Sequence, residues 1–227
     1  MKKVAVAGNT GPGVRSDCQL TLEIRSAGGI KTKLRSKVEA MYGRSIIKLY
    51  EEGLQYFNIK HASIEIIDSG ALPFVHMARL EAAVKSVMET DLELLPEFFD
   101  HCKYESKRDR FRFSRLYLPG NTPSMMLNAG LHSPDGIILD LEDSVAPAKK
   151  HEARFLIRNV LRQVDFYGAE RMVRINQGQR GIDDLKYILP HNVHLILIPK
   201  CESGDYILKL ENKAKEILKA DSMEHKI

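Results

Sequence analysis

The stretch Ile137–Asp143, with the sequence IILDLED, decides the fold of the second half of this 227-residue chain. An uninterrupted apolar start that ends in charged residues is typical of a strand buried on both faces of a sheet. Similar apolar runs occur at Leu116–Leu118, Met172–Ile175 and His194–Ile198. Because buried runs of this kind characterise parallel sheets, we expect the four segments to pair in one such sheet.

Helix signals lie between these runs. Thr122 and Pro123 fit the N-cap and first position of a helix, and apolar residues recur at helical spacing from Lys149 to Leu161. Strands that alternate with helices predict an α/β domain whose sheet is covered by its own helices.

Polar residues end each of the later strands. A strand period of two places them in pairs on one side of each strand: Asp140 with Glu142, Arg174 with Asn176, and Lys200 with Glu202. The carboxyl ends of parallel strands meet at one edge, where α/β enzymes keep their active sites. Burying such charges costs several kcal/mol each unless they are paired or ligated. Two interpretations stay open, a set of mutual ion pairs or an anion-binding, metal-assisted site.

The second interpretation has a specific chemistry. An arginine matches a carboxylate with two parallel hydrogen bonds, and carboxylates can hold Mg²⁺ against a carbonyl oxygen. This combination suits 2-oxo acids and enolates, in which a metal stabilises the oxyanion that develops during carbon–carbon cleavage.

The first ninety residues have a different pattern, which predicts a small ββαβα domain of the α+β class. Alternating residues from Val14 to Ile24 indicate a half-buried strand, and Gly28-Gly29 a turn. The expected elements that follow are a hairpin partner at Ile30–Arg35, a helix at 38–50 capped by Ser36, a third strand around Ile64 and Ile66, a turn at Asp68–Gly70 and a second helix at 74–87.

Basic residues crowd between the two patterns. They are Lys103, Lys107, Arg108, Arg110, Arg112 and Arg115. We interpret residues 93–110 as a basic linker between a domain at 1–92 and a domain at 111–227. The cluster is either solvated or docks the phosphate groups of a cofactor or partner. Phe111 and Phe113 fit the approach to a strand better than RNA contacts.

Composition narrows the function classes. The net charge of +4 does not by itself indicate nucleic-acid binding. No run of apolar residues reaches the roughly 18 that a membrane span needs. Three scattered cysteines indicate reduced thiols, so we expect a cytoplasmic protein. The loop Gly8–Gly13 is followed by a strand pattern, whereas phosphate-binding loops open a helix. Ser16, beside Asp17, is the serine of this loop, either for turn chemistry or presented as a modification site.

Motifs in both halves resemble citrate lyase subunits. Residues 1–92 resemble the acyl carrier (gamma) subunit in Ser16-Asp17, MYGR at 41–44, DSGAL at 68–72 and ARLEA at 78–82. Residues from 112 onward resemble the start of the beta subunit and its aldolase superfamily in SRLYLPGN at 114–121, LDLEDSV at 139–145, VRIN at 173–176 and PKCE at 199–202.

The resemblance implies a function for named residues. It implies that Ser16 bears a phosphoribosyl-dephospho-coenzyme A arm, a phosphopantetheine-like group that would make the chain a phosphoprotein and carry acetyl and citryl thioesters. It further implies Mg²⁺-assisted cleavage of the citryl thioester to oxaloacetate and acetyl carrier. Arg174 matches the arginine that holds the oxaloacetate carboxylate, and Glu142 and Asp143 match the acidic pair near the metal and its waters. The implied partner is an alpha-type acyl-transferase subunit in a cytoplasmic, oligomeric complex.

Two positions depart from the family pattern. The carrier family places its serine two residues before the aspartate, where this chain has Arg15, so Ser16 is displaced by one. In the family, the two direct metal carboxylates lie on later strands, after the motif that PKCE matches, so the resemblance implies ligands beyond Ile227. A (β/α)₈ barrel takes about 250 residues, so residues 111–227 hold about four strand–helix units, half a barrel.

Two alternative functions stay open. They are a non-catalytic carrier or assembly module, and a malyl- or citramalyl-coenzyme A type lyase.

Overall fold

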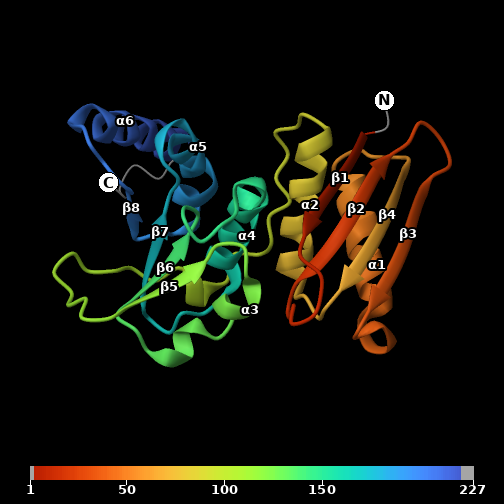
Figure 1. Ribbon diagram of the computed structural model, residues 1–227, viewed down its shortest axis with the longest axis horizontal. Helices are drawn as coiled ribbons and strands as arrows, with labels where there is room; N and C mark the ends of the chain where they lie inside the picture. Colours follow the sequence, from red (N-terminus) through yellow and green to blue (C-terminus); the bar gives the residue numbers. More distant parts are fainter. Residues whose placement is uncertain (1–2, 221–227) are drawn as a thin grey trace. The chain divides into compact units, whose positions relative to one another are not determined.

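The chain folds into two compact units, divided after Pro96, in a computed structural model that describes residues 3–220 (Figure 1). The first unit contains β1 (Lys3–Gly8), β2 (Cys18–Ile24), β3 (Ile30–Ser36), α1 (Glu39–Tyr56), β4 (Ala62–Asp68) and α2 (Pro73–Val87). Its strands form one sheet in the order β1-β2-β4-β3. β1 and β4 run antiparallel to β2, and β3 runs parallel to β4.

Both helices cover the same face of this sheet (Figure 1). α2 packs on β1 and β2, and α1 packs on β3. The side chains that point to the helices are fully buried on β2 and β4, including Leu20, Leu22, Ile64 and Ile66. Val4 and Val6 on the opposite face are about half exposed, at 50% and 56%. The alternation in the sequence is therefore that of a sheet with one covered face.

The topology corrects two expectations for this unit. β1 adds a strand to the predicted ββαβα order, because the small residues Ala5 and Ala7 pack under α2. The predicted hairpin of β2 with β3 is wrong, since β4 lies between them. The physical reason is burial: β4 alternates fully buried residues, as a central strand does, whereas β3 is only half-buried and carries Lys31 and Lys33, as edge strands do.

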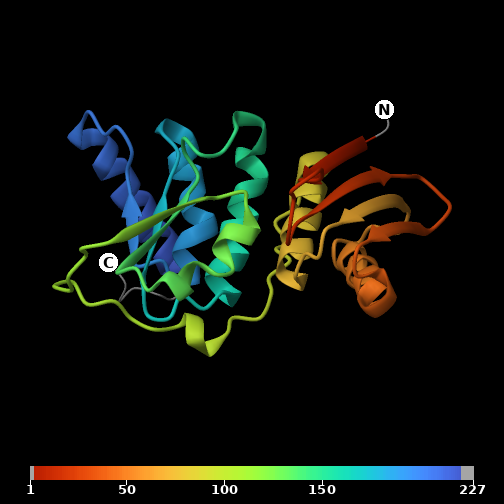
Figure 2. The ribbon, with the colours of Figure 1, turned by 60° about the horizontal axis from the view of Figure 1, so that its bottom comes forward.

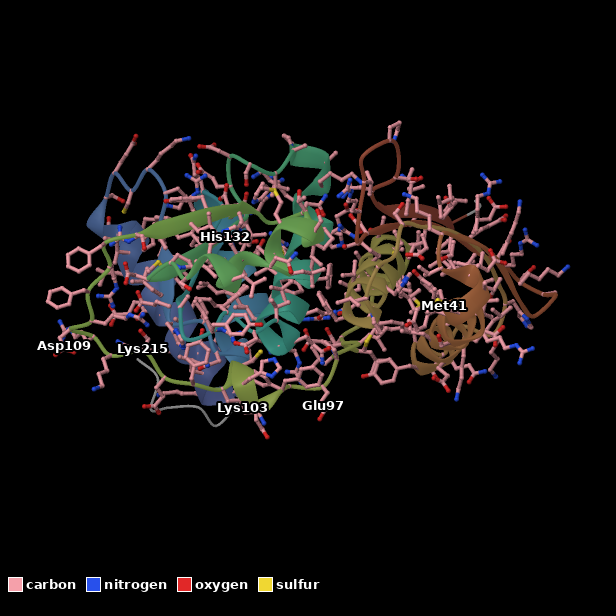
Figure 3. All side chains as sticks on the ribbon, turned by 90° about the horizontal axis from the view of Figure 1, so that it is seen from below. Met41, Glu97, Lys103, Asp109, His132 and Lys215 are labelled. Carbon is pink, nitrogen blue, oxygen red and sulfur yellow. The ribbon has the colours of Figure 1, made fainter. Side chains whose placement is uncertain are left out.

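The start of α1 also differs from the expectation. The helix begins at Glu39 with Val38 at its N-cap position. Ser36 does not cap it, because its hydroxyl donates to Asp68 (2.5 Å) and accepts from the amide of Val38 (3.0 Å). Met41, expected on the buried face, is 75% exposed and lies on the outside of α1 (Figure 3).

The second unit is built on a parallel sheet, as the sequence predicts. Its elements are η1 (Asp100–Cys102), β5 (Arg115–Pro119), α3 (Pro123–Met126), η2 (Ala129–His132), β6 (Gly136–Asp140), η3 (Pro147–Lys149), α4 (Lys150–Gln163), β7 (Glu170–Arg174), α5 (Gly178–Ile188), η4 (Leu189–His191), β8 (Leu195–Leu197) and α6 (Gly204–Ala220). The strands pair in chain order, β5-β6-β7-β8, and every pair is parallel.

The long helices line one face of this sheet (Figure 2). α5 packs between α4 and α6. Fully buried residues include Leu139 and Val173 on the strands and Leu156 on α4. Sequential parallel strands with their helices on one side place all four carboxyl strand ends at the same edge.

Residues 97–113, which include most of the predicted linker, pack on the second unit. The amide of Phe99 donates to the carbonyl of Arg162 (3.0 Å), and the Tyr104 hydroxyl donates to the carbonyl of Ala169 (2.5 Å). Arg112 forms a two-pronged ion pair with Glu170. Lys103 and Asp109 point outward from this segment (Figure 3). Several basic side chains here thus have structural partners.

Among residues 3–220, no helix combines the length and the hydropathy of a membrane-spanning segment.

Candidate functional site

The central contact at the carboxyl edge of the second sheet joins β7 to β6. Arg174 binds Asp140 through two hydrogen bonds, from Nε to Oδ1 and from Nη2 to Oδ2, both 2.7 Å long. Its third nitrogen, Nη1, lies 3.3 Å from Oε2 of Glu142. The guanidinium also lies over the Tyr117 ring of β5, 5.2 Å from its centroid. Three neighbouring strands therefore position one arginine.

Asp140 shapes the loop that follows β6. Its carboxylate accepts hydrogen bonds from the backbone amides of Glu142 (2.8 Å) and Ser144 (3.0 Å). Burial would raise the pKa of Asp140, but the hydrogen bonds from Arg174, from Ser144 and from these amides outweigh it and lower the pKa to about 2. Asp140 is therefore a carboxylate at neutral pH and a fixed partner for Arg174.

Glu142 lies at the centre of a second set of contacts. Its Oε1 accepts from Nε2 of Gln177 (2.6 Å) and lies 3.2 Å from Nζ of Lys200. Lys200 also lies 3.5 Å from Asp143, and the hydrogen bond with Glu142 raises the lysine pKa. Oε2 of Glu142 is buried and accepts no hydrogen bond from the described residues. The loop after β8 thus reaches the loop after β6.

Two pockets flank this cluster. One, of about 440 Å³, is lined by Tyr117, Asp140, Ser144 and Arg174 together with the end of β5. The other, of about 430 Å³, is lined by the Glu142–Pro147 loop, the residues after β7 and the side chain of Lys150. Burial lowers the pKa of Lys150, whose ammonium donates to the carbonyls of Leu141 and Glu142. Both pockets have the mixed polar lining of a small-molecule site.

The structure brings together four of the six polar residues paired in the sequence analysis. Asp140, Glu142, Arg174 and Lys200 form one ion-pair cluster. Asn176 lines the pocket beside Glu142, and its side-chain amide donates to the buried carboxylate of Asp184 (2.8 Å). Glu202 is exposed. The contacts of Gln177 and Tyr117 were not predicted from the sequence. The available signals were that Gln177 follows the VRIN motif and that Tyr117 lies within SRLYLPGN.

The described carboxylates do not make up a magnesium site. No group of three or more His, Cys, Asp or Glu side chains with a metal-binding arrangement occurs among residues 3–220. Glu142 and Asp143 are the donors at the edge, and both are near Lys200. We therefore assign no chemical step to a metal held by these residues.

Ser16 lies at a fixed point of the first unit. Its amide donates to the carbonyl of Ser69 (3.0 Å), and the amide of Ser69 donates to the carbonyl of Asp17 (2.9 Å). Ser16 has a φ of 55°, in the left-handed region. The preceding loop contains three glycines with positive φ, Gly8, Gly11 and Gly13. A strained residue after a glycine-rich loop is a common feature of functional positions.

Asp17 anchors this serine to α2. It pairs with Arg79 through two hydrogen bonds, from Nε to Oδ1 (3.0 Å) and from Nη2 to Oδ2 (2.8 Å). Both side chains are buried, with exposed fractions of 2% and 0%. Asn9 and the amide of Cys18 also donate to Asp17. Arg79 lies within the ARLEA motif, but the motif alone does not predict its pairing with Asp17.

Two family models match the chain, one for each unit. Residues 2–87 match the model described as malonate decarboxylase delta subunit, and residues 114–224 match the model described as HpcH/HpaI aldolase/citrate lyase. The two units thus define a carrier-type domain joined to an aldolase-type domain.

Individual relatives identify the similar subunits more specifically than the family models do. The chain is 35% identical over 92 residues to the citrate lyase acyl carrier protein of Streptococcus mutans, which covers 40% of this chain and 87% of the relative. It is 36% identical over 110 residues to the citrate lyase subunit beta of Leuconostoc mesenteroides, which covers 46% of this chain and 35% of the relative. The chain belongs to the citrate lyase family, with regions similar to its acyl carrier and beta subunits.

One solved structure is similar to part of this chain. It is described as CitE complexed with the triphosphate group of ATP from Mycobacterium tuberculosis, with 31% identity, 44% of each chain covered and a TM-score of 0.37. The chain spans 35% and 39% of the length of the two beta subunits first compared with it.

Proposed function

We propose that the chain carries an acyl thioester on Ser16 and binds the oxo-acid product of thioester cleavage at Arg174, as a fused component of a citrate lyase. The observation that supports it most is the presence, in one chain, of a serine fixed at the end of a glycine-rich loop and an arginine fork held by Asp140. The prosthetic group is proposed to be phosphoribosyl-dephospho-coenzyme A, attached to the hydroxyl of Ser16.

Arg174 has a second edge for a substrate carboxylate. Because Nε and Nη2 bind Asp140, the Nη1–Nη2 edge remains for a ligand, and it faces the buried Oε2 of Glu142. A carboxylate that binds this edge in two-pronged fashion replaces the 3.3 Å contact with Glu142. Tyr117 and Asp140 fix the guanidinium plane, so the ligand is oriented as well as bound. We propose Glu142 and Asp143 as the acidic pair beside the reacting carbons.

The proposed reaction is cleavage of citryl thioester to oxaloacetate and acetyl thioester. Magnesium belongs to the proposal through the family, with ligands that the described residues do not supply, and the second unit would be part of a (β/α)₈ barrel. The proposed partners are an alpha-type acyl-transferase subunit and further subunits of a cytoplasmic, oligomeric complex. A malyl- or citramalyl-coenzyme A substrate is less favoured, because a free coenzyme A ester needs no carrier domain.

Mass spectrometry tests the carrier role. The chain is produced in a host that contains the modifying enzymes, and Ser16→Ala serves as the comparison. We expect a mass increase equal to the arm on the peptide that contains Ser16, and none in the variant. An unmodified Ser16 in that host would contradict the carrier role, as would an arm found on Ser69 instead.

A turnover assay tests the lyase role. Citryl thioester and Mg²⁺ are incubated with the chain, with Arg174→Ala and with Arg115→Ala, a matched arginine at the opposite end of the sheet. We expect the cleavage rate to fall at least tenfold in the Arg174 variant, which corresponds to about 1.4 kcal/mol of transition-state binding. The rate of the Arg115 variant should be unchanged. Equal rates in all three chains would contradict the proposal.

A second candidate function follows from the incomplete metal site. If residues 114–220 contribute only Arg174 and its neighbours, the chain acts as a carrier and assembly module on which other lyase subunits dock. The absence of a three-ligand cluster among the described residues favours this alternative. In the turnover assay, no cleavage by the chain supports this alternative, whereas cleavage that depends on Arg174 rejects it.

A further inference from the structure

A pocket of about 420 Å³ lies between the start of α1 and the connection from β4 to α2. Its wall is mostly apolar and includes Tyr42, Ile46, Leu49, Leu72 and Pro73. No lysine, arginine, aspartate or glutamate is among the residues that line it. Cavities of roughly 300–1,000 Å³ with this lining hold small molecules in many proteins. The roles of Ser16 and Arg174 do not account for this pocket.

Two polar groups interrupt the apolar wall. Ser45 donates its hydroxyl hydrogen to the carbonyl of Tyr42 (2.8 Å), so its oxygen can still accept a hydrogen bond from a ligand. His76 lies at the base, with Nδ1 2.9 Å from the hydroxyl of Tyr50. Burial lowers the pKa of His76, so the imidazole is neutral at pH 7. The pocket therefore offers an aromatic ring, apolar side chains and a hydroxyl acceptor, without a charge.

The two walls of the pocket are tied together before any ligand binds. Asp68 accepts hydrogen bonds from the amides of Gly70 (3.0 Å) and Ala71 (2.8 Å), and the hydroxyl of Ser36 donates to the same carboxylate. Ser36 in turn accepts from the amide of Val38, which lines the pocket at the start of α1. The β4–α2 connection and the start of α1 thus share one anchor, and the pocket is formed in advance.

Ser16 lies close to the rim of this pocket. Its amide is bound to the carbonyl of Ser69, and the next residues, Gly70 and Ala71, line the pocket. Gly70 has a φ of +81° and open space where a side chain would stand, so the rim is unobstructed there. Two exposed cations flank the same region, Arg15 beside Ser16 and Lys37 beside Val38. They suit phosphate groups that remain in solvent between the serine and the pocket.

From this geometry we propose that the pocket binds the adenine nucleoside of the arm carried on Ser16, an inference that rests on the proposed carrier function. The citryl group carries carboxylates, which an uncharged apolar pocket excludes, and an acetyl group is too small to fill it. A planar purine stacks on Tyr42 and Leu72, and its exocyclic amine donates to Ser45. In this arm the phosphoribosyl unit links the serine to the nucleoside, so the nucleoside is nearer to Ser16 than the pantetheine portion is.

The consequence concerns the reach of the thioester. With the nucleoside held in the pocket, only the pantetheine portion swings, so the thiol explores a smaller volume at a higher effective concentration than it does on a fully flexible arm. The first unit then acts as a docked base for the arm as well as its point of attachment.

Binding of free fragments tests the pocket independently of modification. The unmodified Ser16→Ala chain is titrated with adenosine 5′-monophosphate and, separately, with pantetheine, while methyl NMR follows Ile46, Leu49 and Leu72. We expect saturable shifts of these methyls with the nucleotide and none with pantetheine. No shift with either probe, or shifts with pantetheine only, would overturn the proposal. Because Ser16 is absent, this result says nothing against the carrier role, which mass spectrometry tests.

A pair of helix variants sharpens the test. Ser45→Phe puts a ring into the pocket, and Glu51→Phe puts the same ring on the exposed part of α1. We expect at least tenfold weaker nucleotide binding in the first and unchanged binding in the second. In the modified chain, cross-relaxation between the adenine protons and the Leu72 methyls should be present and should vanish in Ser45→Phe. Equal binding by both variants, or cross-relaxation that survives in Ser45→Phe, would contradict the assignment.

Discussion

Arg79 on α2 and Asp17 after the glycine-rich loop form a buried, two-pronged ion pair, with bonds of 3.0 and 2.8 Å. The pair connects two of the motifs that resemble the carrier subunit, one around Ser16-Asp17 and one at 78–82. Ser16 is adjacent to this anchor in the chain. The position of the proposed attachment site therefore depends on Arg79, which lies sixty-two residues from Asp17 in sequence.

The buried pair predicts a large loss of stability in Asp17→Asn. The variant keeps the shape of the side chain but removes the charge that faces Arg79, and breaking a buried pair from one side costs about 3–5 kcal/mol. Hydrogen exchange of the β2 amides in the full chain measures the change within the first unit. The control is Glu65→Gln, which removes an exposed pair with Lys33 and should cost less than about 1 kcal/mol. Equal losses in both variants would contradict the assigned role of Asp17.

The carboxyl edge of the second sheet could be predicted from the sequence because it depends on local pattern. Apolar runs that end in Asp140 and Arg174 place the two residues at the ends of neighbouring strands, and the register Asp140 with Arg174 confirms it. The role of Asn176 could not be predicted, because it depends on Asp184, a buried acid on α5 whose burial follows from helix packing.

The order of strands in the first sheet was less predictable. β2 and β3 are joined by Gly28-Gly29 and both alternate, which are the features of a hairpin. Insertion of β4 between them is decided by long-range burial, since Ile64 and Ile66 are fully buried and the residues of β3 are not. Local propensity does not predict this strand order. It also does not predict β1, whose buried residues are small.

Asp140 is expected to titrate far below an ordinary aspartate. Its pKa is about 2, against roughly 3.9 for an unperturbed side chain. Because the folded value is lower than the unfolded one, its contribution to stability is fully present above about pH 4 and is lost as the pH falls toward 2. Carboxyl-carbon NMR of the full chain from pH 1.5 to 7 measures the midpoint directly.

Removing the partner of Asp140 should reverse the direction of the shift. In Arg174→Met the charge-assisted hydrogen bonds are lost while burial remains, so the pKa of Asp140 should rise by at least one unit. Arg115→Met, at the other end of the sheet, is the control and should leave the midpoint in place. An unchanged midpoint in Arg174→Met would show that Ser144 and the backbone amides alone hold the carboxylate ionised.

The three cysteines should differ sharply in reactivity. Cys18 and Cys102 are buried, and burial raises the pKa of Cys18 to about 12 and raises that of Cys102, whereas Cys201 is exposed. Since the thiolate is the reactive form, iodoacetamide at pH 8 should label Cys201 at least a hundredfold faster than the other two. Peptide mass spectrometry over time measures the three rates, and urea should make them equal. Rapid labelling of Cys18 in the folded chain would contradict its buried position on β2 beside Tyr50.

Any side chain in place of Gly120, in the SRLYLPGN motif, is expected to destabilise the second unit for steric reasons. A Cβ there would lie 2.4 Å from the carbonyl oxygen of Asp140 and 2.8 Å from Cδ1 of Ile157, so β6 or α4 has to move. We expect Gly120→Ala to destabilise the second unit by about 1–3 kcal/mol, the usual cost of overpacking. Gly204→Ala at the start of α6 meets open space and should be neutral or slightly stabilising. Hydrogen exchange of the β6 amides compares the two variants. The Gly120 amide donates to the main-chain carbonyl of Asp140 (2.8 Å), so the Gly120 variant should shift the end of β6 and with it the Asp140 carboxylate that binds Arg174. An unaltered Asp140 midpoint would show that the strand end accommodates the methyl group without moving the carboxylate.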